Sequence, residues 1–306
     1  MTSVNTNTGA MTALMSLNST SSALASTEKK ISTGYKVADA TDDGAAYAVA
    51  QGVRANVSVL TSVNNQLGNA TGLMSVTNSA LTSASEYMKT ISSDLTNIAA
   101  GTANETANYV AKFAQDLGQL SGYLSGASYN GQSLIATAGV AANANTGVAA
   151  TTAVTGASQK LTIDDVGGTK TLSSTNYDLG AFLTSVSNAI GGASADATTT
   201  AGLTAIQTAA ASYVNAAAGS AGLKADTAAL NKVASQGGSD ANFITNQQTF
   251  NSAKMDALNV GLGALVDADL AKESANLTAL QIKQQLGQQS LSISNQAPSG
   301  LVSLFR

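Results

Sequence analysis

A heptad repeat in the first third of the chain constrains the fold more than any other feature of the sequence. Apolar residues at every third and fourth position form a stripe along one face of a helix. Fourteen of the sixteen positions of this repeat are apolar. The pattern predicts a long helix over residues 45–99 that packs against other helices. One row of the repeat is Ala46, Val53, Leu60, Leu67, Met74, Leu81, Met88 and Leu95, and the other is Val49, Asn56, Val63, Ala70, Thr77, Ala84, Ile91 and Ile98.

Such a helix is longer than a compact domain of this chain is wide. It would span about 80 Å at ~1.5 Å per residue. A compact globule of 306 residues is about 50 Å across. We therefore expect an elongated molecule. Gly68 and Gly72 lie within the repeat and cost roughly 1 kcal/mol each relative to Ala, so the helix could also break into two there.

Further helical stripes occur on both sides of this segment. The stretch ETANYVAKFAQDLGQLSGYL places five apolar residues on one face and is short enough to fold back on the long helix. A weaker heptad at the N-terminus contains Leu14 and Leu17, with Ser21 and Glu28 at other positions of the same stripe. The two sets are Val110, Phe113, Leu117, Leu120 and Leu124, and Ala10, Leu14, Leu17, Leu24 and Ile31.

Helical periodicity returns after Leu203 and is clearest from Phe243 to Leu291. Pro298 should end this pattern. Because both ends of the chain carry apolar helical stripes, we expect the N- and C-terminal helices to pair and form one rod. The C-terminal stripe consists of Leu258, Leu262, Leu265, Leu270, Leu277, Leu280, Ile282, Leu286 and Leu291.

The middle of the chain is different in composition. Asn130-Gly131 in SYNGQSLI is typical of a two-residue hairpin turn, since both residues tolerate positive φ. Residues 137–200 are rich in Ala, Thr, Gly, Ser and Asn, with β-branched runs such as KLTIDDV. We expect a small strand-containing insertion there, with one short helix near AFLTSVSNAI and no site of its own. The fold class predicted is mainly α, with a helical coiled-coil rod, a β-hairpin and this outer insertion.

Composition excludes several classes of activity. The chain has no His and no Cys, which excludes Ser-His-Asp and Cys-His nucleophiles, His-ligated zinc and disulfides. Its net charge is −4 without a basic block, so nucleic-acid binding is not indicated. No apolar run approaches the length of a membrane span, and no Lys or Arg precedes Lys29, so we expect no cleaved signal peptide. We expect no enzymatic activity, cofactor or metal.

The acidic pairs in the sequence have structural interpretations. Asp42-Asp43 directly precedes GAAYAVA, which is predicted to begin a helix. Carboxylates at this place stabilise a helix N-terminus by capping and by interaction with the helix dipole. Asp164-Asp165 is interpreted as a turn. Asp267-x-Asp269 is interpreted as a solvated face or a polar contact between subunits.

The two ends of the chain resemble the bacterial flagellins. The resemblance is carried by VNTNTGAMTAL, by ISTGYKVADATDDGAAYAVA, by SYNGQSLI and by the closing LVDADLAKESANLTALQIKQQLGQQSLSISNQAPSGLVSLFR. These motifs cover about the first 135 and last 100 residues. The resemblance implies a subunit that self-assembles into the flagellar filament used for motility, located outside the cell. It also implies export in an unfolded state through the flagellar type III channel, with folding on polymerisation.

The resemblance further implies a division of the chain. Residues 1–35 and 266–306 would be inner-tube helices, residues 36–136 and 201–265 a helical rod core, and residues 137–200 a variable outer part. Partners would be further copies, possible sister flagellins, an export chaperone, and cap and junction proteins. The residues expected to pack between subunits are Leu14, Leu17, Leu24, Ile31, Leu280, Leu291, Leu301, Val302, Leu304 and Phe305; those of the rod-core seam are Val49, Val53, Leu60, Val63, Leu67, Leu81, Ile91 and Leu95.

Departures and alternatives remain open at this point. Family members activate a vertebrate Toll-like receptor through arginines on the first long helix, but Met88–Thr96 contains none, which predicts weak receptor activation. Where flagellins usually have Ser-Ser-Gly, this chain has Ser32-Thr33-Gly34, and the basic residue that usually precedes this motif is Lys30.

The alternatives are a hook–filament junction protein, which has related terminal helices, and a surface adhesin carried by residues 137–200.

Overall fold

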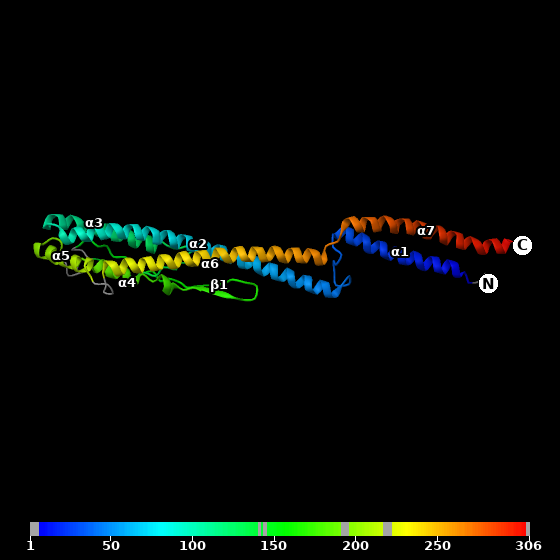
Figure 1. Cartoon of the computed structure of the whole chain (residues 1–306), viewed down its shortest axis with the longest axis horizontal. Coiled ribbons are helices and arrows are strands. Elements are labelled where there is room, and N and C mark those ends of the chain that lie inside the picture. The colour runs from blue at the N-terminus through cyan, green and yellow to red at the C-terminus, as the bar shows by residue number, and fades with distance from the viewer. Residues whose placement is uncertain (1–5, 140–141, 143–145, 191–195, 217–221, 304–306) are drawn as a thin grey trace. The chain divides into compact units, whose positions relative to one another are not determined.

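The computed structural model describes residues 6–139, 142, 146–190, 196–216 and 222–303, and the side chains of all of these except residues 103 and 297–303 (Figure 1). The chain divides into two compact units. The first consists of Met1–Ser58 and Lys254–Arg306, and the second of Val59–Ala253. Within the described part of the chain, no helix is both long and apolar enough to cross a membrane.

The first unit is built around α1 (Thr8–Thr33) and α7 (Leu270–Ser303), which run antiparallel and side by side (Figure 1). This confirms the expected pairing of the terminal helices. Gly34 ends α1 in the left-handed conformation, with φ of 75°, which glycine adopts without steric cost. The chain then runs beside the start of α7, because the Ala268 amide donates to the Gly34 carbonyl at 2.9 Å.

A small apolar cluster in the same unit holds the connector, residues 34–43, which joins α1 to α2. Val37 of the connector packs with Ala50 of α2 (Gly44–Ala100) and with Val266 at the end of α6 (Leu223–Val266). The Lys36 amide donates to the Val266 carbonyl at 2.8 Å. Asp43 caps α2, because its Oδ1 accepts the amides of Ala45 and Ala46 at 3.0 and 2.9 Å. The interpretation of this acidic pair as a helix start is confirmed for Asp43, whereas Asp42 accepts hydrogen bonds from Lys29 and from the Ala38 amide.

Pro298 does not end the C-terminal helix, and this prediction was wrong. Helix α7 continues through Pro298 to Ser303. Proline cannot donate to the carbonyl four residues earlier, so an interior proline leaves that carbonyl without its helical partner. The carbonyl concerned is that of Ser294, and it accepts a hydrogen bond from the Asn7 side chain at 2.8 Å. A contact from another helix thus removes one penalty that the sequence pattern alone attributes to the proline.

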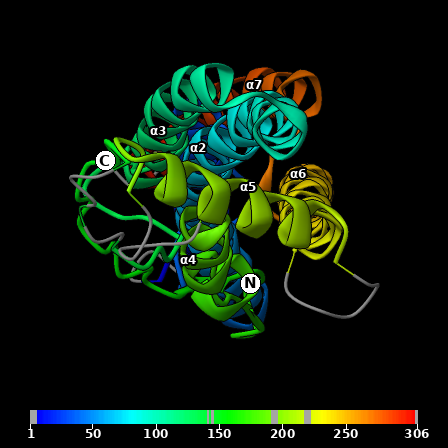
Figure 2. The same ribbon diagram turned by 90° about the vertical axis from the view of Figure 1, so that its left-hand side faces the viewer.

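The second unit contains the main core. The greater part of α2, all of α3 (Ala103–Ser125) and the N-terminal part of α6 contribute to it; Figure 2 looks roughly along these helices. Glu105 closes a capping box with Thr102 at the start of α3. The apolar face predicted for α3 is confirmed, since all five of its residues are buried: Val110, Phe113, Leu117, Leu120 and Leu124.

Helix α2 is continuous over 57 residues, so the suggested break at Gly68 or Gly72 does not occur. Gly72 has a packing role. A Cβ atom at this position would lie 2.8 Å from Cζ of Tyr129, so the absence of a side chain makes room for the aromatic ring. The propensity cost of a helical glycine is offset here by a tertiary contact.

The predicted tight turn is present. Asn130 and Gly131 have φ of 51° and 76°, and Tyr129 and Gln132 form an antiparallel bridge around them. The hairpin is limited to this bridge rather than extending into strands. The longer hairpin of the unit lies in the insertion, where β1 (Gln159–Thr162) pairs antiparallel with β2 (Thr169–Leu172). In the turn between β1 and β2, Asp164 accepts hydrogen bonds from the amides of Val166 and Gly168, which agrees with the predicted turn at Asp164-Asp165.

Three further elements complete this unit: the 3-10 helix η1 (Ser174–Tyr177), α4 (Gly180–Asn188) and α5 (Thr200–Val214). Tyr177 is fully buried and donates to Asp240 of α6 at 2.8 Å. Lys170 of β2 pairs with the same carboxylate at 3.3 Å. Burial, with the hydrogen bond to Asp240 as a second cause, raises the pKa of Tyr177 well above its usual range. The insertion is therefore fastened to α6 by a protonated phenol and an ion pair.

Candidate assembly surfaces of the terminal helices

The interface between α1 and α7 is close-packed and formed largely by small side chains. A Cβ on Gly9 would lie 2.8 Å from Ser294 Oγ, and one on Gly287 would lie 3.3 Å from Leu17 Cδ1. Helix surfaces approach this closely only where side chains are small or absent. Most of the shielded residues of α1 follow a heptad of three- and four-residue steps: Ala10, Ala13, Leu17, Thr20, Leu24, Thr27 and Ile31. Ser21, Lys29 and Lys30 are also partly shielded.

This seam differs by one position from the sequence pattern. Ala13, Thr20 and Thr27 occupy one row, whereas Leu14 and Glu28 of the predicted row are exposed and only Ser21 is partly shielded. The shielded face of α1 is centred on Leu17, which lies against Gly287 of α7, and on Leu24, and Leu14 lies outside this face. Five of the residues predicted to pack between subunits are half-buried within the pair of helices: Leu17, Leu24, Ile31, Leu280 and Leu291.

The displaced leucine belongs to an apolar face that the single chain leaves open. Leu14 is 48% exposed, beside Met11 at 63% and Met15 at 73%. Helix α7 carries a similar row, with Ile282 at 53%, Leu286 at 58% and Ile293 at 69% exposed. Exposed apolar residues in contiguous rows mark sites of association. Sequence analysis named Leu14 for such contacts but missed Met11, Met15 and Ile293, although their helical spacing to named residues was a usable signal.

The C-terminal tail is described only in part. Leu301 and Val302 belong to α7, but their side chains lie outside the described part of the chain. Leu304 and Phe305 lie outside the described residues altogether.

Asp269 begins α7 by accepting the amides of Ala271 and Lys272, both at 3.1 Å. This carboxylate is therefore a helix cap rather than a purely solvated group.

The rod-core positions are buried from residue 60 onward. Val49 is 57% exposed and Val53 is half-buried. Before residue 60 the buried row shifts by one position, so that Ala50 takes the place of Val49. A straight helix drifts relative to a strict seven-residue repeat, and this end of α2 packs on Val37 and Val266 instead. The predicted seam residues that are buried are Leu60, Val63, Leu67, Leu81, Ile91 and Leu95.

An ion cluster orders the connector after α1. The Lys29 ammonium donates to Asp39 at 2.6 Å and to Asp42 at 3.0 Å. The hydrogen bond from Lys29 holds the pKa of both carboxyls below their ordinary value of 3.8. The hydrogen bond to Asp39, in turn, raises the pKa of Lys29 above 10.5. Both aspartates are therefore structural partners of a lysine.

The shifts predict how the connector responds to pH. Depressed carboxyl pKa values stabilise the fold above pH 3.8, and this contribution is lost as the pH falls through the folded-state values. The raised pKa of Lys29 contributes below pH 10.5, and this is lost as the pH rises through its folded-state value. We expect Lys29→Gln to move the pKa of Asp39 up toward 3.8, measured by carboxyl-carbon NMR titration. Lys30→Gln, which removes a neighbouring charge, should leave it low; equal values in both variants would contradict this account.

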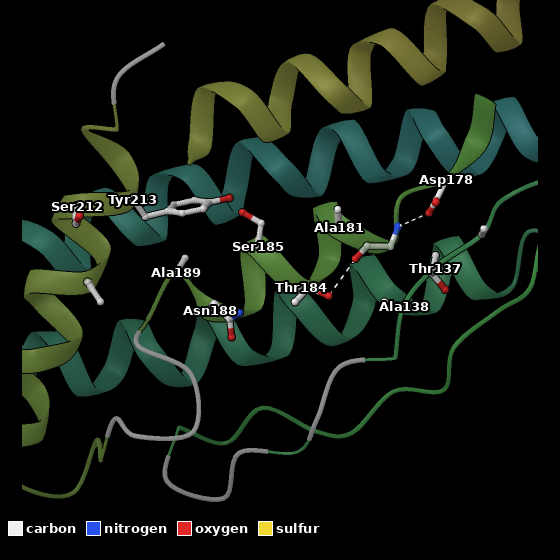
Figure 3. Close-up of a pocket in the computed structure, with 13 residues that line it drawn as sticks. Thr137, Ala138, Asp178, Ala181, Thr184, Ser185, Asn188, Ala189, Ser212 and Tyr213 are labelled. Carbon is white, nitrogen blue, oxygen red and sulfur yellow. Dashed lines mark hydrogen bonds between the residues drawn. The ribbon is translucent and has the colours of Figure 1, made fainter. Parts of the chain in front are cut away.

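A surface pocket of about 980 Å³ lies between α4, α5 and the segment around Thr137 (Figure 3). Its lining is mostly Ala, Ser and Thr side chains. Tyr213 donates to Asp226, and burial, followed by that hydrogen bond, raises the pKa of its phenol far above the usual range. Ser185 lies beside this phenol (Figure 3). Because the phenol stays protonated, it cannot act as a base toward the serine at ordinary pH.

Among the described residues, no three acidic, His or Cys side chains gather into a metal site.

The chain matches two family models and is similar to several known proteins. The Bacterial flagellin N-terminal helical region matches residues 4–140, and the Bacterial flagellin C-terminal helical region matches residues 222–305. Flagellin FljK of Caulobacter vibrioides is 34% identical over 100% of this chain and 99% of its own length. The flagellin of Brucella melitensis is 28% identical and Flagellin C of Rhizobium meliloti 29%, each over 100% of both chains.

Both family models cover the helical regions at the two ends of the chain, and the relatives are structural proteins of the flagellum. The chain belongs to the bacterial flagellin family. It is a structural subunit of the flagellar filament. The alternatives of a junction protein or an adhesin are not favoured, since the full-length relatives are flagellins.

Proposed function

We propose that this flagellin assembles by burying the open apolar faces of α1 and α7, together with its C-terminal tail, against neighbouring copies. The observation that carries the proposal is the pair of exposed rows on these helices, of which Met15 and Ile293 are about seven-tenths exposed. Burial of apolar surface contributes about 25 cal/mol per Å². Contacts between different faces of identical copies that do not close produce a helical fibre. The tail residues included are Leu301, Val302, Leu304 and Phe305.

The proposal assigns a place in the filament to each part of the chain. Residues 1–35 and 266–306 form the inner tube, residues 36–136 and 201–265 form the rod core, and residues 137–200 face outward. Support comes from the close pairing of α1 with α7, which leaves apolar rows open, and from the buried seam of α2, which is satisfied within its own unit. From Leu60 onward the rod-core seam is thus internal, whereas the terminal helices supply contacts between copies.

The same proposal includes export before folding. The chain passes unfolded through the flagellar type III channel with a chaperone on its C-terminal helix, and then folds at the tip next to cap and junction proteins and sister flagellins. The absence of cysteine removes disulfides as an obstacle to threading. Ordering a residue costs roughly 1–2 kcal/mol of conformational entropy, which the thin α1–α7 seam offsets only when neighbours add apolar burial. The role is structural and not enzymatic, and the folded protein is extracellular.

Seeded polymerisation tests this proposal. Purified protein is mixed with short filament fragments at neutral pH, observed by electron microscopy, and followed by circular dichroism. We expect long tubes and a gain in helicity. The variant Ile282→Ser/Leu286→Ser should fail to elongate seeds, because apolar surface is lost from the exposed row. The matched variant Gln281→Ser/Gln285→Ser changes exposed polar neighbours on the same helix and should elongate them. Monomers with complete terminal helices and no tubes would refute the proposal.

A further inference from the structure

The C-terminal helix contains a proline whose cost is met by the other end of the chain. Helix α7 runs without interruption past Pro298. In an α-helix the amide of residue 298 would donate to the carbonyl of residue 294. Proline has no amide hydrogen. The Ser294 carbonyl, which is partly buried, therefore has to find its donor outside α7.

Asn7 supplies that donor and caps α1 with the same side chain. Its Nδ2 donates to the Ser294 carbonyl at 2.8 Å, while its Oδ1 accepts the Ala10 amide at 3.1 Å. Ser294 Oγ also lies 3.4 Å from Oδ1 as a further donor. A neutral amide offers both donors and acceptors. These partners require an asparagine with Oδ1 directed at α1 and Nδ2 directed at α7.

Gly9 permits the two helices to come this close. A Cβ at residue 9 would lie 2.8 Å from Ser294 Oγ and 3.5 Å from Asn7 Oδ1. The contact therefore combines three features from opposite ends of the chain. They are the side-chain amide of Asn7 at the N-cap of α1, Gly9 in the first turn of α1, and Pro298 four residues after Ser294 in α7.

We propose that Asn7, Gly9, Ser294 and Pro298 form a clasp that sets the register of the two terminal helices. In a helix without Pro298, the Ser294 carbonyl would be satisfied in any register of α1 against α7. With Pro298 present, this carbonyl depends on the register that brings Asn7 to Ser294, and a shift of α1 along α7 gives up that hydrogen bond. A buried polar group without a partner is costly, so other registers are penalised, as with a single polar residue in a coiled-coil seam. Asn7 is thus a positioning residue for assembly, beyond the apolar contacts already proposed.

The variant Asn7→Asp separates the clasp from simple capping. Aspartate still accepts the Ala10 amide and is as good a cap as asparagine, but it cannot donate to Ser294. We expect the critical concentration for seeded filament growth to rise about fivefold, the effect of one typical hydrogen bond. The unchanged chain is measured in parallel, so a failure of assembly itself would be evident there. If Asn7→Asp grows at the wild-type concentration, Asn7 is only a cap and the clasp is refuted.

Rescue at residue 298 provides the decisive control. Pro298→Ala restores an amide that can donate to the Ser294 carbonyl within α7. In this background, we expect Asn7→Asp to raise the critical concentration by less than about twofold, because the carbonyl no longer depends on Asn7. A general loss of packing would persist in both backgrounds, and an equal penalty with and without the proline would overturn the proposal. Pro298→Ser restores the same amide and serves as an independent second background.

Discussion

Removal of residues 297–306 is expected to abolish polymerisation while leaving the helices of the second unit folded. The deletion removes four large apolar residues, Leu301, Val302, Leu304 and Phe305, each contributing about 1.5–3 kcal/mol when buried. The core of Val59–Ala253 lies entirely within its own unit and does not include these residues. Electron microscopy of seeded protein measures the loss of filaments, and thermal unfolding followed by circular dichroism measures the retained fold.

Two controls make this experiment specific. The deletion also removes Pro298, so a variant with Leu301, Val302, Leu304 and Phe305 all changed to Ser keeps the clasp and removes only apolar surface. It should fail to polymerise as the truncation does. The variant Leu301→Met/Leu304→Met retains apolar side chains of similar volume and should form filaments. Normal filaments from the truncated chain would refute the role given to the tail.

Phe113→Ala is expected to lower the free energy of unfolding of the second unit by about 3–5 kcal/mol. The Phe113 side chain is fully buried in the core where α3 packs. Its removal loses apolar burial and leaves a cavity, because surrounding helices relax only partly. Thermal and denaturant unfolding of the monomer measure the change.

Phe250→Ala is the matched control for this substitution. It is the same chemical change on α6, but Phe250 is 60% exposed, so unfolding of the monomer should change by no more than about 0.5 kcal/mol. Equal losses in the two variants would show that the core described here is not the one that holds the unit together. If Phe250→Ala weakens filament growth without altering monomer stability, its ring belongs to a contact between copies.

Local patterns in the sequence predicted much of the fold. The heptad of α2 from Leu60 onward, the apolar face of α3 and the positive-φ turn at Asn130-Gly131 all appear in the structure. These features depend on residues within one or two helical turns, or on one peptide turn. Neighbouring side chains along the chain therefore carry nearly all the information that they require.

The predictions that were wrong concern positions where a segment distant in the sequence packs against the helix. Gly72 does not break α2, because Tyr129 fills the space that its missing side chain leaves. The seam of α1 includes Ala13 rather than Leu14, because α7 lies on the side of α1 that carries Leu17. Periodicity identifies an apolar stripe but not the direction in which the partner helix lies, and that direction decides which row is shielded.

The sequence by itself determined that this is a helical protein with paired apolar ends and a flagellin-like pattern, because periodicity, caps and turn residues act over short separations. Only the tertiary structure decided which apolar rows remain open and how Pro298 stays within α7. The donor that satisfies the Ser294 carbonyl comes from Asn7, 287 residues away along the chain. A hydrogen bond over such a separation leaves no periodic signal, because it depends on the three-dimensional approach of two helices.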